Sequence, residues 1–337
     1  MADKTPVVHI IGGESLLGRE VVDVVGSAKL PAQVKVVAAI EPDESAKAIL
    51  TAQKGEAVVL TPLRPGDLAG SRVILLADTA ASPAKVVEAA QAEPDPPVLV
   101  DVTRALEDNP AARLRAPMVE TAPPPAAPIY VIAHPAAIAL ALFLKRLATA
   151  GKIRRIVALV FEPASERGKK GLDELQQQTV GLLSFQKLKT KVFDTQVSFN
   201  MLPRYGSDAV KSLEDVEAAV ERHLATLLSS DPGIPLPSLR VVHAPVFHGY
   251  SFSVWVEFEN RPETKTIAGA LATARIEVRG ADEEPASNVG AAGQNGITVG
   301  SIAPDRNDPR ACWFWIVADN LRIAAENAVE VARELLA

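Results

Sequence analysis

The chain has 337 residues, of which 48% are hydrophobic and 23% charged, a composition that excludes a disordered protein and suffices for two packed domains. Its 41 acidic and 35 basic side chains give a formal charge of −6, which argues against nucleic-acid binding because that function needs a basic face. The single cysteine excludes an internal disulfide and a cysteine-cluster zinc site, and we expect no metal site.

We expect the protein to be cytoplasmic. A chain with one cysteine suits a reducing compartment. The most apolar long stretch, IAHPAAIALALFL, is shorter than the roughly 20 residues of a membrane span and contains a histidine and a proline. The N-terminal MADKTPVVHIIGG has no apolar core ahead of a cleavage site, so no signal peptide is predicted.

The first 133 residues alternate short apolar runs with helical patterns. Strands that alternate with helices indicate a parallel sheet covered on both faces. In the second helix, Ser82 is the expected N-cap and Pro83 the first helical residue. The strands are predicted in the runs that begin at Val7, Val34, Ala57, Arg72, Pro97 and Tyr130, and the helices in those that begin at Leu16 and Ser82.

A proline-rich stretch, APMVETAPPPAAP, occupies residues 116–128 and is predicted to be a surface connection near the domain boundary. Beyond it, a helix is predicted from Ile138 to Gly151, and strands from Ser251 and Ala274 show an alternating pattern. Alternation is typical of an antiparallel sheet with one face on helices or on another subunit. The predicted fold class is α/β, with residues 1–133 and the C-terminal helix 320–337 in one domain and residues 134–319 in the other.

The turn GGESLLG follows the first predicted strand and opens a helix. Glycines at such a turn let the backbone approach a pyrophosphate, and the helix start offers free N–H groups. The alternative interpretation is a tight strand-to-helix turn without a ligand. Glu41, near the end of the second strand, favours NAD over NADP if it binds a ribose hydroxyl, or is a solvated turn residue. The candidate nucleotide-binding residues of this turn are Gly12, Gly13, Glu14, Ser15, Leu16, Leu17 and Gly18.

Five segments resemble segments of aspartate-semialdehyde dehydrogenases, in the same order and over nearly the whole chain. They are GGESLLG, GKKGLDELQQQT, SFNMLPRYG, APVFHGYSFSVWVEFE and FWIVADNLRIAAENAVEVARELL. The resemblance implies a Rossmann-like N-terminal domain and an α/β C-terminal domain that forms a homodimer. The family reaction is the NADP-dependent reductive dephosphorylation of β-aspartyl phosphate, in which a cysteine forms a thioester that a hydride then reduces.

The chain departs from the family at the positions that carry this chemistry. The cysteine of the family's N-P-x-C motif corresponds to Ala137, and the histidine base of its G-H-S motif to Tyr250. A methyl group cannot attack a carbonyl, and a phenol that titrates near 10 is a poor base at neutral pH. The arginine that binds substrate corresponds to His243, and the glutamine that orients intermediates to Glu162.

The family's phosphate and cofactor positions are altered as well. The arginine of the phosphate site corresponds to Glu107, and the arginine that meets the NADP 2′-phosphate to Glu44. His134 either meets a nicotinamide or makes a hydrogen bond to backbone at the loop end, and Asn320 is a further candidate for cofactor binding. The chain therefore resembles in particular the cysteine-less paralogues of the family.

Three hypotheses follow. The first is a homodimer without the family's catalysis that still binds NAD, with NADP less favoured. The second is an oxidoreductase that uses His248 or Tyr250 for proton transfer, since both residues would share a face of an alternating strand. The third is a partner protein of an active paralogue. Cys312, in the apolar run ACWFWIV, is predicted to be a buried and inert thiol.

Several other polar and aromatic side chains are expected to have structural roles. His9 lies inside the first predicted strand and is expected to be a satisfied core histidine. The basic segment SERGKKG from Ser165 is interpreted as a solvated loop before a helix, with anion binding as the alternative. Trp313 and Trp315 are expected in the core or in a dimer interface.

Overall fold

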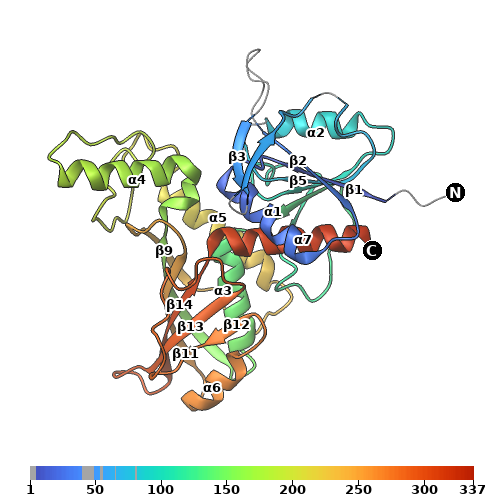
Figure 1. Ribbon diagram of the computed structural model, residues 1–337. Coiled ribbons are helices and arrows are strands. Elements are labelled where there is room, and N and C mark those ends of the chain that lie inside the picture. Colours follow the sequence, from blue (N-terminus) through green and yellow to red (C-terminus); the bar gives the residue numbers. More distant parts are fainter. Residues whose placement is uncertain (1–4, 40–48, 54–55, 65, 80–81) are drawn as a thin grey trace. The chain divides into compact units, whose positions relative to one another are not determined.

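The computed structural model describes residues 5–39, 49–53, 56–64, 66–79 and 82–337 (Figure 1). It divides into two compact units, one of Met1–Ala133 with Ala324–Ala337 and the other of His134–Ile323. Within the described ranges, no helix combines the length and the apolar character that crossing a membrane requires.

The first unit is Rossmann-like, with a six-stranded sheet in the order β2-β1-β5-β6-β8-β7 whose neighbouring strands are all parallel. The chain leaves β1 toward β2 on one side and later returns to β5 on the other, so the turn after β1 lies at the switch point of the sheet. The elements are β1 (Val7–Ile11), α1 (Leu16–Ala28), β2 (Gln33–Val37), β5 (Ser71–Leu76), α2 (Pro83–Gln91), β6 (Val98–Asp101), β7 (Ala112–Arg115) and β8 (Ile129–Ile132).

Two details of the first unit differ from the sequence prediction. The apolar run at Ala57 is a strand, β4 (Glu56–Leu60), but it pairs antiparallel with β3 (Ile49–Gln53) in a separate hairpin. Ser82 is the N-cap of α2 and Pro83 its first residue, as predicted, but the Ser82 side chain makes no cap hydrogen bond, so the fixed φ of Pro83 is what favours the helix start. His9 is confirmed as a core histidine, because it is buried and its Nδ1 lies 2.7 Å from Ser71 Oγ.

A buried arginine fastens the last helix within the first unit. Arg115 ends β7 and is only 2% exposed, and its Nε lies 2.9 Å from Glu120 Oε2. Its Nη2 lies 2.5 Å from Glu334 Oε2, on α7 (Asn320–Leu336). The guanidinium also lies over the Tyr130 ring, 5.1 Å from its centroid. One cation thus satisfies two carboxylates and joins β7 to the C-terminal turns of α7.

The second unit contains a mixed six-stranded sheet in the order β10-β9-β11-β14-β13-β12. The central strand β11 is antiparallel to both neighbours, as its alternating pattern predicts. The predicted helix from Ile138 begins earlier, at Pro135, and ends at Leu147, before Gly151. The strands are β9 (Ile153–Glu162), β10 (Ser238–His243), β11 (Tyr250–Phe258), β12 (Ile276–Val278), β13 (Ile297–Pro304) and β14 (Ala311–Ala318), and the helices are α3 (Pro135–Leu147), a 3-10 turn (Ala164–Arg167), α4 (Gly168–Leu183), α5 (Leu213–Leu228) and α6 (Thr264–Leu271).

The two faces of this sheet differ in burial. The side chains of Phe252, Val254 and Val256 are 0% exposed, and Phe314 of β14 meets Phe143 of α3 edge to face, with ring centroids 5.0 Å apart. Alternate residues of the same strands form the other face, where Val157 is 43% exposed and Trp313 is 42% exposed. We call this second surface the open face; it comprises Val157, Leu159, Phe161, Ser253, Trp255, Trp313 and Trp315.

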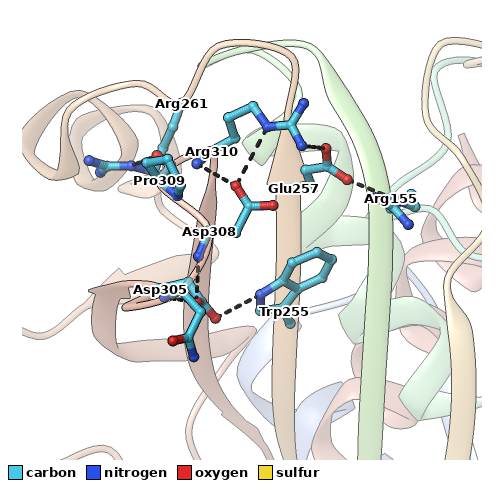
Figure 2. A network of polar contacts seen from close by, with 9 residues as sticks. Arg155, Trp255, Glu257, Arg261, Asp305, Asp308, Pro309 and Arg310 are labelled. Carbon is cyan, nitrogen blue, oxygen red and sulfur yellow. Dashed lines mark hydrogen bonds and ion pairs between the residues drawn. The ribbon is translucent and has the colours of Figure 1, made fainter.

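A hairpin loop holds the tryptophans of the open face. Asp305 Oδ2 accepts hydrogen bonds from Nε1 of Trp255 at 3.0 Å and from Nε1 of Trp313 at 2.7 Å. Close by, the buried carboxylate of Glu257 lies between Arg155 and Arg310, at 2.7 and 2.8 Å (Figure 2). Backbone N–H groups of the loop bind Asp305 as well and lower its pKa to about 2. The open face is therefore a surface whose aromatic rings are fixed in advance.

Candidate functional site

The glycines of the turn after β1 are required by the packing of the turn itself. Gly12 has a φ of +92°, and a Cβ there would lie 2.5 Å from the Cβ of Asp78. A Cβ at Gly13 would overlap Val36, and one at Gly18 would overlap the carbonyl oxygen of Gly12. A close turn alone thus accounts for these three glycines, whether or not a ligand binds.

Ser15 is the N-cap of α1, and its side chain occupies one of the backbone N–H donors at the start of the helix. Its Oγ accepts a hydrogen bond from Gly18 N at 2.8 Å and donates one to Ala77 O at 3.0 Å. Leu16 and Leu17 occupy the first two positions of α1, where N–H groups have no partner within a helix. Their amides, at the positive end of the helix dipole, are suited to a phosphate.

An acidic side chain in the same turn opposes an anionic ligand. Glu14 Oε1 accepts a hydrogen bond from Ala39 N at 2.9 Å and so joins the turn to the segment after β2. Its carboxylate therefore stays beside the helix start, where its negative charge disfavours a phosphate. Glu41 and Glu44, the two residues expected to select NAD, lie outside the described residues.

Four polar side chains converge at the ends of β9 and β10 in the second unit. Glu162 and His243 are directly paired in the sheet register. Tyr205 OH bridges them, 3.3 Å from Glu162 Oε1 and 3.0 Å from His243 Nδ1, and Arg167 Nη2 lies 2.9 Å from Glu162 Oε1. The guanidinium carbon of Arg167 also lies 5.4 Å from the centroid of the Tyr205 ring. We call these four side chains the polar centre.

Burial controls the ionisation of the polar centre. It raises the pKa of Glu162 to about 6, a shift that Arg167 opposes and Glu166 reinforces. It lowers the pKa of His243 to about 4, with the Arg167 charge acting in the same direction. Burial and the neighbouring Glu162 raise the pKa of Tyr205. At neutral pH the centre thus holds an ionised Glu162 and Arg167, with His243 and Tyr205 uncharged.

The polar centre keeps unused hydrogen-bonding capacity. Within the described part of the chain, Glu162 Oε2, Arg167 Nε and His243 Nε2 are buried and have no hydrogen-bond partner. Each such atom costs about 1–3 kcal/mol. Titratable groups with shifted pKa values and unsatisfied polar atoms are typical of functional sites, so the polar centre is the candidate site.

Other sequence-predicted residues lie around Glu166, which precedes Arg167. His134 caps α3, accepting a hydrogen bond from Ala136 N, and its Nε2 lies 3.8 Å from Glu166 Oε2. Asn320 Nδ2 donates to Glu166 Oε1 at 2.9 Å, and Asn320 Oδ1 accepts from Gly249 N. The structure therefore brings His134 and Asn320 to the same carboxylate, although the sequence proposed both for cofactor binding. Ala137 is fully buried in the first turn of α3.

The expectation that His248 and Tyr250 share a strand face is wrong. β11 begins at Tyr250, and the intervening Gly249 has a φ of +83°, so strand alternation does not extend to His248. Tyr250 is 1% exposed, with its ring centroid 5.9 Å from that of His134. His248 is half-buried, and its carbonyl accepts a hydrogen bond from Asn288.

Cys312 is a buried strand residue, as the sequence predicts. It is 0% exposed on β14, and burial raises the pKa of its thiol. Cys312 pairs with Val256, whereas Ala318, six residues along β14, pairs with Tyr250. At about 3.4 Å per residue the thiol lies roughly 20 Å along the sheet from Tyr250.

The sequence interpretation missed Arg167 and Tyr205. Arg167 belongs to the basic segment interpreted as a solvated loop, yet it is only 8% exposed and paired with Glu162. Tyr205 lies in the SFNMLPRYG segment, whose residues show no local pattern that indicates a site. A signal was present for Arg167, since a glutamate at the end of a buried strand needs a cation nearby.

Comparisons with known proteins find similarity to semialdehyde dehydrogenases and to USG-1 proteins. A family model described as the dimerisation domain of semialdehyde dehydrogenase matches residues 144–323. An aspartate-semialdehyde dehydrogenase of Rickettsia bellii is 30% identical over 61% of this chain and 62% of its own length. A USG-1 protein homolog of Pseudomonas aeruginosa is 30% identical over 71% of each chain.

Solved structures extend the likeness to the whole fold. The aspartate semialdehyde dehydrogenase II of Vibrio cholerae, complexed with ASA, superposes with a TM-score of 0.82 and 25% identity, over 99% of this chain and 98% of that one. A probable aspartate-semialdehyde dehydrogenase of Pseudomonas aeruginosa also gives a TM-score of 0.82, over 99% of both chains at 24% identity.

The raised pKa of Glu162 predicts a window in the pH dependence of stability. The unfolded carboxyl ionises near its ordinary value of 4.5 and the folded one near 6, so the fold loses about 2 kcal/mol as the pH rises through this range. The Glu162→Gln variant lacks this loss. The free energy of unfolding of the variant minus that of the wild type should therefore rise between pH 4.5 and 6 and then level off, measured by urea denaturation.

Two comparisons control this measurement. His243 stabilises the fold increasingly as the pH rises from 4 to 6.5, because its folded pKa is lowered, but it is present in both proteins. The exposed Glu214→Gln variant controls for the loss of one carboxylate. A difference that stays flat from pH 4.5 to 6 would contradict the assignment.

Proposed function

The chain belongs to the semialdehyde dehydrogenase family, and we propose that it is a member that binds a nicotinamide nucleotide but does not carry out the family's thioester chemistry. The observation that carries this proposal is Ala137 at the position of the family's nucleophilic cysteine, in the first turn of α3. An alanine methyl has no lone pair with which to attack a carbonyl carbon. The only cysteine of the chain is buried in β14, far along the sheet from Tyr250.

The other substitutions support the same proposal. Tyr250 stands at the position of the family's base, and a phenol holds its proton at neutral pH. Glu162 places a carboxylate at the position of the family's glutamine, and Arg167 already pairs with it at 2.9 Å. The only guanidinium of the polar centre therefore has a partner within the protein, and an anionic substrate would have to compete for it.

The glycine-rich turn supports nucleotide binding. A nicotinamide dinucleotide would place its pyrophosphate against the amides of Leu16 and Leu17 at the start of α1, where the geometry fits an anion. When bound, such a cofactor supplies or accepts a hydride. The negative charge of Glu14 weakens the binding of the pyrophosphate. We propose NAD rather than NADP as the ligand, because the acidic residues Glu41 and Glu44 would repel a 2′-phosphate.

We also propose a homodimer that forms through the open face. The family model that matches residues 144–323 is that of a dimerisation domain. Val157, Trp255 and Trp313 lie in register across three strands, and a hollow of about 520 Å³ adjoins Trp313 and Trp315. An exposed aromatic patch of this kind is typical of a protein interface.

A turnover assay tests the catalytic proposal. With aspartate semialdehyde, phosphate and either NAD or NADP, we expect no production of NADH or NADPH above the rate without protein, because no thiol can form the acyl adduct. Wild type, Tyr250→Phe and Cys312→Ala should be indistinguishable in absorbance at the reduced-cofactor band. Turnover that Tyr250→Phe abolishes would instead establish the second candidate, an oxidoreductase that uses Tyr250 for proton transfer.

Nucleotide binding is tested by thermal shift and calorimetry. We expect NAD to raise the melting temperature more than NADP at equal concentration, since a bound ligand stabilises the folded state. Glu14→Gln keeps an oxygen for Ala39 N and removes the charge, so it should tighten NAD binding by about three- to tenfold. Glu88→Gln, an equal change of charge on α2, should have no effect. A preference for NADP, or an unchanged affinity in Glu14→Gln, would count against the assignment.

Light scattering with size-exclusion chromatography tests the homodimer. The wild type should have twice the chain mass of 35.7 kDa. Leu159→Arg with Trp313→Arg places two charges on the open face and should shift the protein toward the monomer by at least about tenfold in dissociation constant. Val59→Asp, which alters an exposed apolar residue of the first unit, is the control. A dimer that is unaffected by the double substitution would rule out this face.

A further inference from the structure

The C-terminal end of α4 adopts an unfavourable backbone conformation that no packing within the described chain offsets. The helix ends in a Schellman motif, in which Gln186 N donates to Gly181 O at 2.8 Å and Phe185 N to Leu182 O at 3.3 Å. The left-handed position of this motif is normally glycine, but here it is Phe185, with a φ of 54°. The side chain of Phe185 is 99% exposed.

Further apolar side chains are exposed beside Phe185. Val180 and Leu183, one helical turn apart on α4, are 55% and 71% exposed. Phe199 is 68% exposed, and it too has a left-handed backbone, with a φ of 56°. The loop that carries it adjoins α4, since Ser198 Oγ lies 2.8 Å from Thr179 Oγ. Two strained and exposed phenylalanines indicate a contact outside the chain, because strain that persists normally has a use.

Basic residues continue this surface. Lys187, Lys189 and Lys191 are exposed, and the segment from Leu183 to Lys191 contains no acidic residue. None of the three lysines forms an ion pair with a described residue. The chain as a whole carries a charge of −6, so this is a local reversal of sign. We call the surface formed by Val180, Leu183, Phe185, Lys187, Lys189 and Lys191 the α4 tip.

The same unit carries a surface complementary to the α4 tip. Asp282, Glu283 and Glu284 are consecutive and exposed in the loop between β12 and β13. Val289, further along this loop, is 79% exposed. We call residues 282–289 the acidic loop. It offers three carboxylates and an apolar side chain to a surface of three ammonium groups and apolar side chains.

The sheet topology places the two surfaces beside opposite edges of the sheet, and the far end of the acidic loop lies at the end of the sheet from which α4 begins. α4 follows the C-terminal end of β9, beside the edge strand β10. The acidic loop follows the other edge strand, β12, and Asn288 Nδ2 within it donates to the carbonyl of His248, just before β11. If two open faces pack about a two-fold axis along the strands, the β12 edge of one copy lies over the β10 edge of the other.

We propose that the α4 tip binds the acidic loop of a second copy of this chain, so that each dimer contains the contact twice. The inference rests on the proposed homodimer and adds a second contact to it. A closed symmetric dimer requires both complementary surfaces on one chain, and both lie within residues 144–323, the stretch that matches a dimerisation domain. A second copy satisfies this requirement without any other partner.

A charge exchange tests the pairing. Lys187→Glu, Lys189→Glu and Lys191→Glu together should raise the dimer dissociation constant by about tenfold or more, measured by sedimentation at low ionic strength. The triple variant Asp282→Lys, Glu283→Lys and Glu284→Lys should do the same. Combining the two sets should return the constant to within about threefold of the wild type, because attraction is restored. The exposed Lys265→Glu is the control and should change nothing.

Phe185→Gly separates this contact from a structural role. Glycine removes the strain of the left-handed backbone, so the melting temperature of the protomer should rise. It is measured at a protein concentration below the dissociation constant of the dimer, so that the protomer is the main species. The same variant should weaken the dimer by about tenfold, because the aromatic contact is lost. A more stable protomer with an unchanged dissociation constant would overturn the inference.

The outcomes also separate this inference from the proposed homodimer. A chain that is monomeric at all concentrations overturns both. A dimer whose dissociation constant is unchanged by the lysine reversal leaves the homodimer in place and overturns the α4 tip contact. Reversals that weaken the dimer without rescue in the combined variant overturn the assignment of the acidic loop as the partner of the tip.

Discussion

The ion pair between Glu162 and Arg167 is the constraint on which the second unit depends. A carboxylate that is 0% exposed at the end of a central strand would be strongly destabilising alone. The guanidinium of Arg167, 2.9 Å away, offsets that penalty, and the hydroxyl of Tyr205 adds a hydrogen bond. The pair therefore fixes the 3-10 turn before α4 against β9, and it fixes the Tyr205 loop against His243 of β10.

The contacts of the polar centre explain how the fold accommodates the residues at positions 162 and 243, which the resemblance identifies as departures from the family. The glutamate at position 162 has a cation at position 167, and the histidine at position 243 shares a hydrogen bond with the hydroxyl of Tyr205. The cation that compensates Glu162 comes from the 3-10 turn. The polar centre thus combines compensating contacts with buried polar atoms that have no hydrogen-bond partner among the described residues.

The sequence predicted features that depend on neighbouring residues in the chain, and it missed contacts between segments that are distant in the chain. The Rossmann-like sheet, the glycine turn and the buried Cys312 strand followed from apolar runs and turn residues, because each depends on neighbours along the chain. Arg167 and Tyr205 did not follow, because they meet Glu162 only after distant segments fold together. His248 was misplaced because strand alternation was extended across Gly249, whose positive φ ends the strand. The β3-β4 hairpin was missed because a short apolar run does not reveal which strand it pairs with.

The period of two in a strand joins the candidate site to the surface proposed for assembly. Adjacent residues of β9 point to opposite faces, so Glu162 belongs to the polar centre while Phe161 faces the open side and meets Trp315, with ring centroids 5.9 Å apart. One peptide bond therefore separates a residue of the site from a residue of the open face. A partner that packs on Phe161 restrains the backbone that positions the Glu162 carboxylate. Because Phe161 and Glu162 are adjacent in the chain, a shift of the backbone at the end of β9 would move a residue of the open face and a residue of the polar centre together.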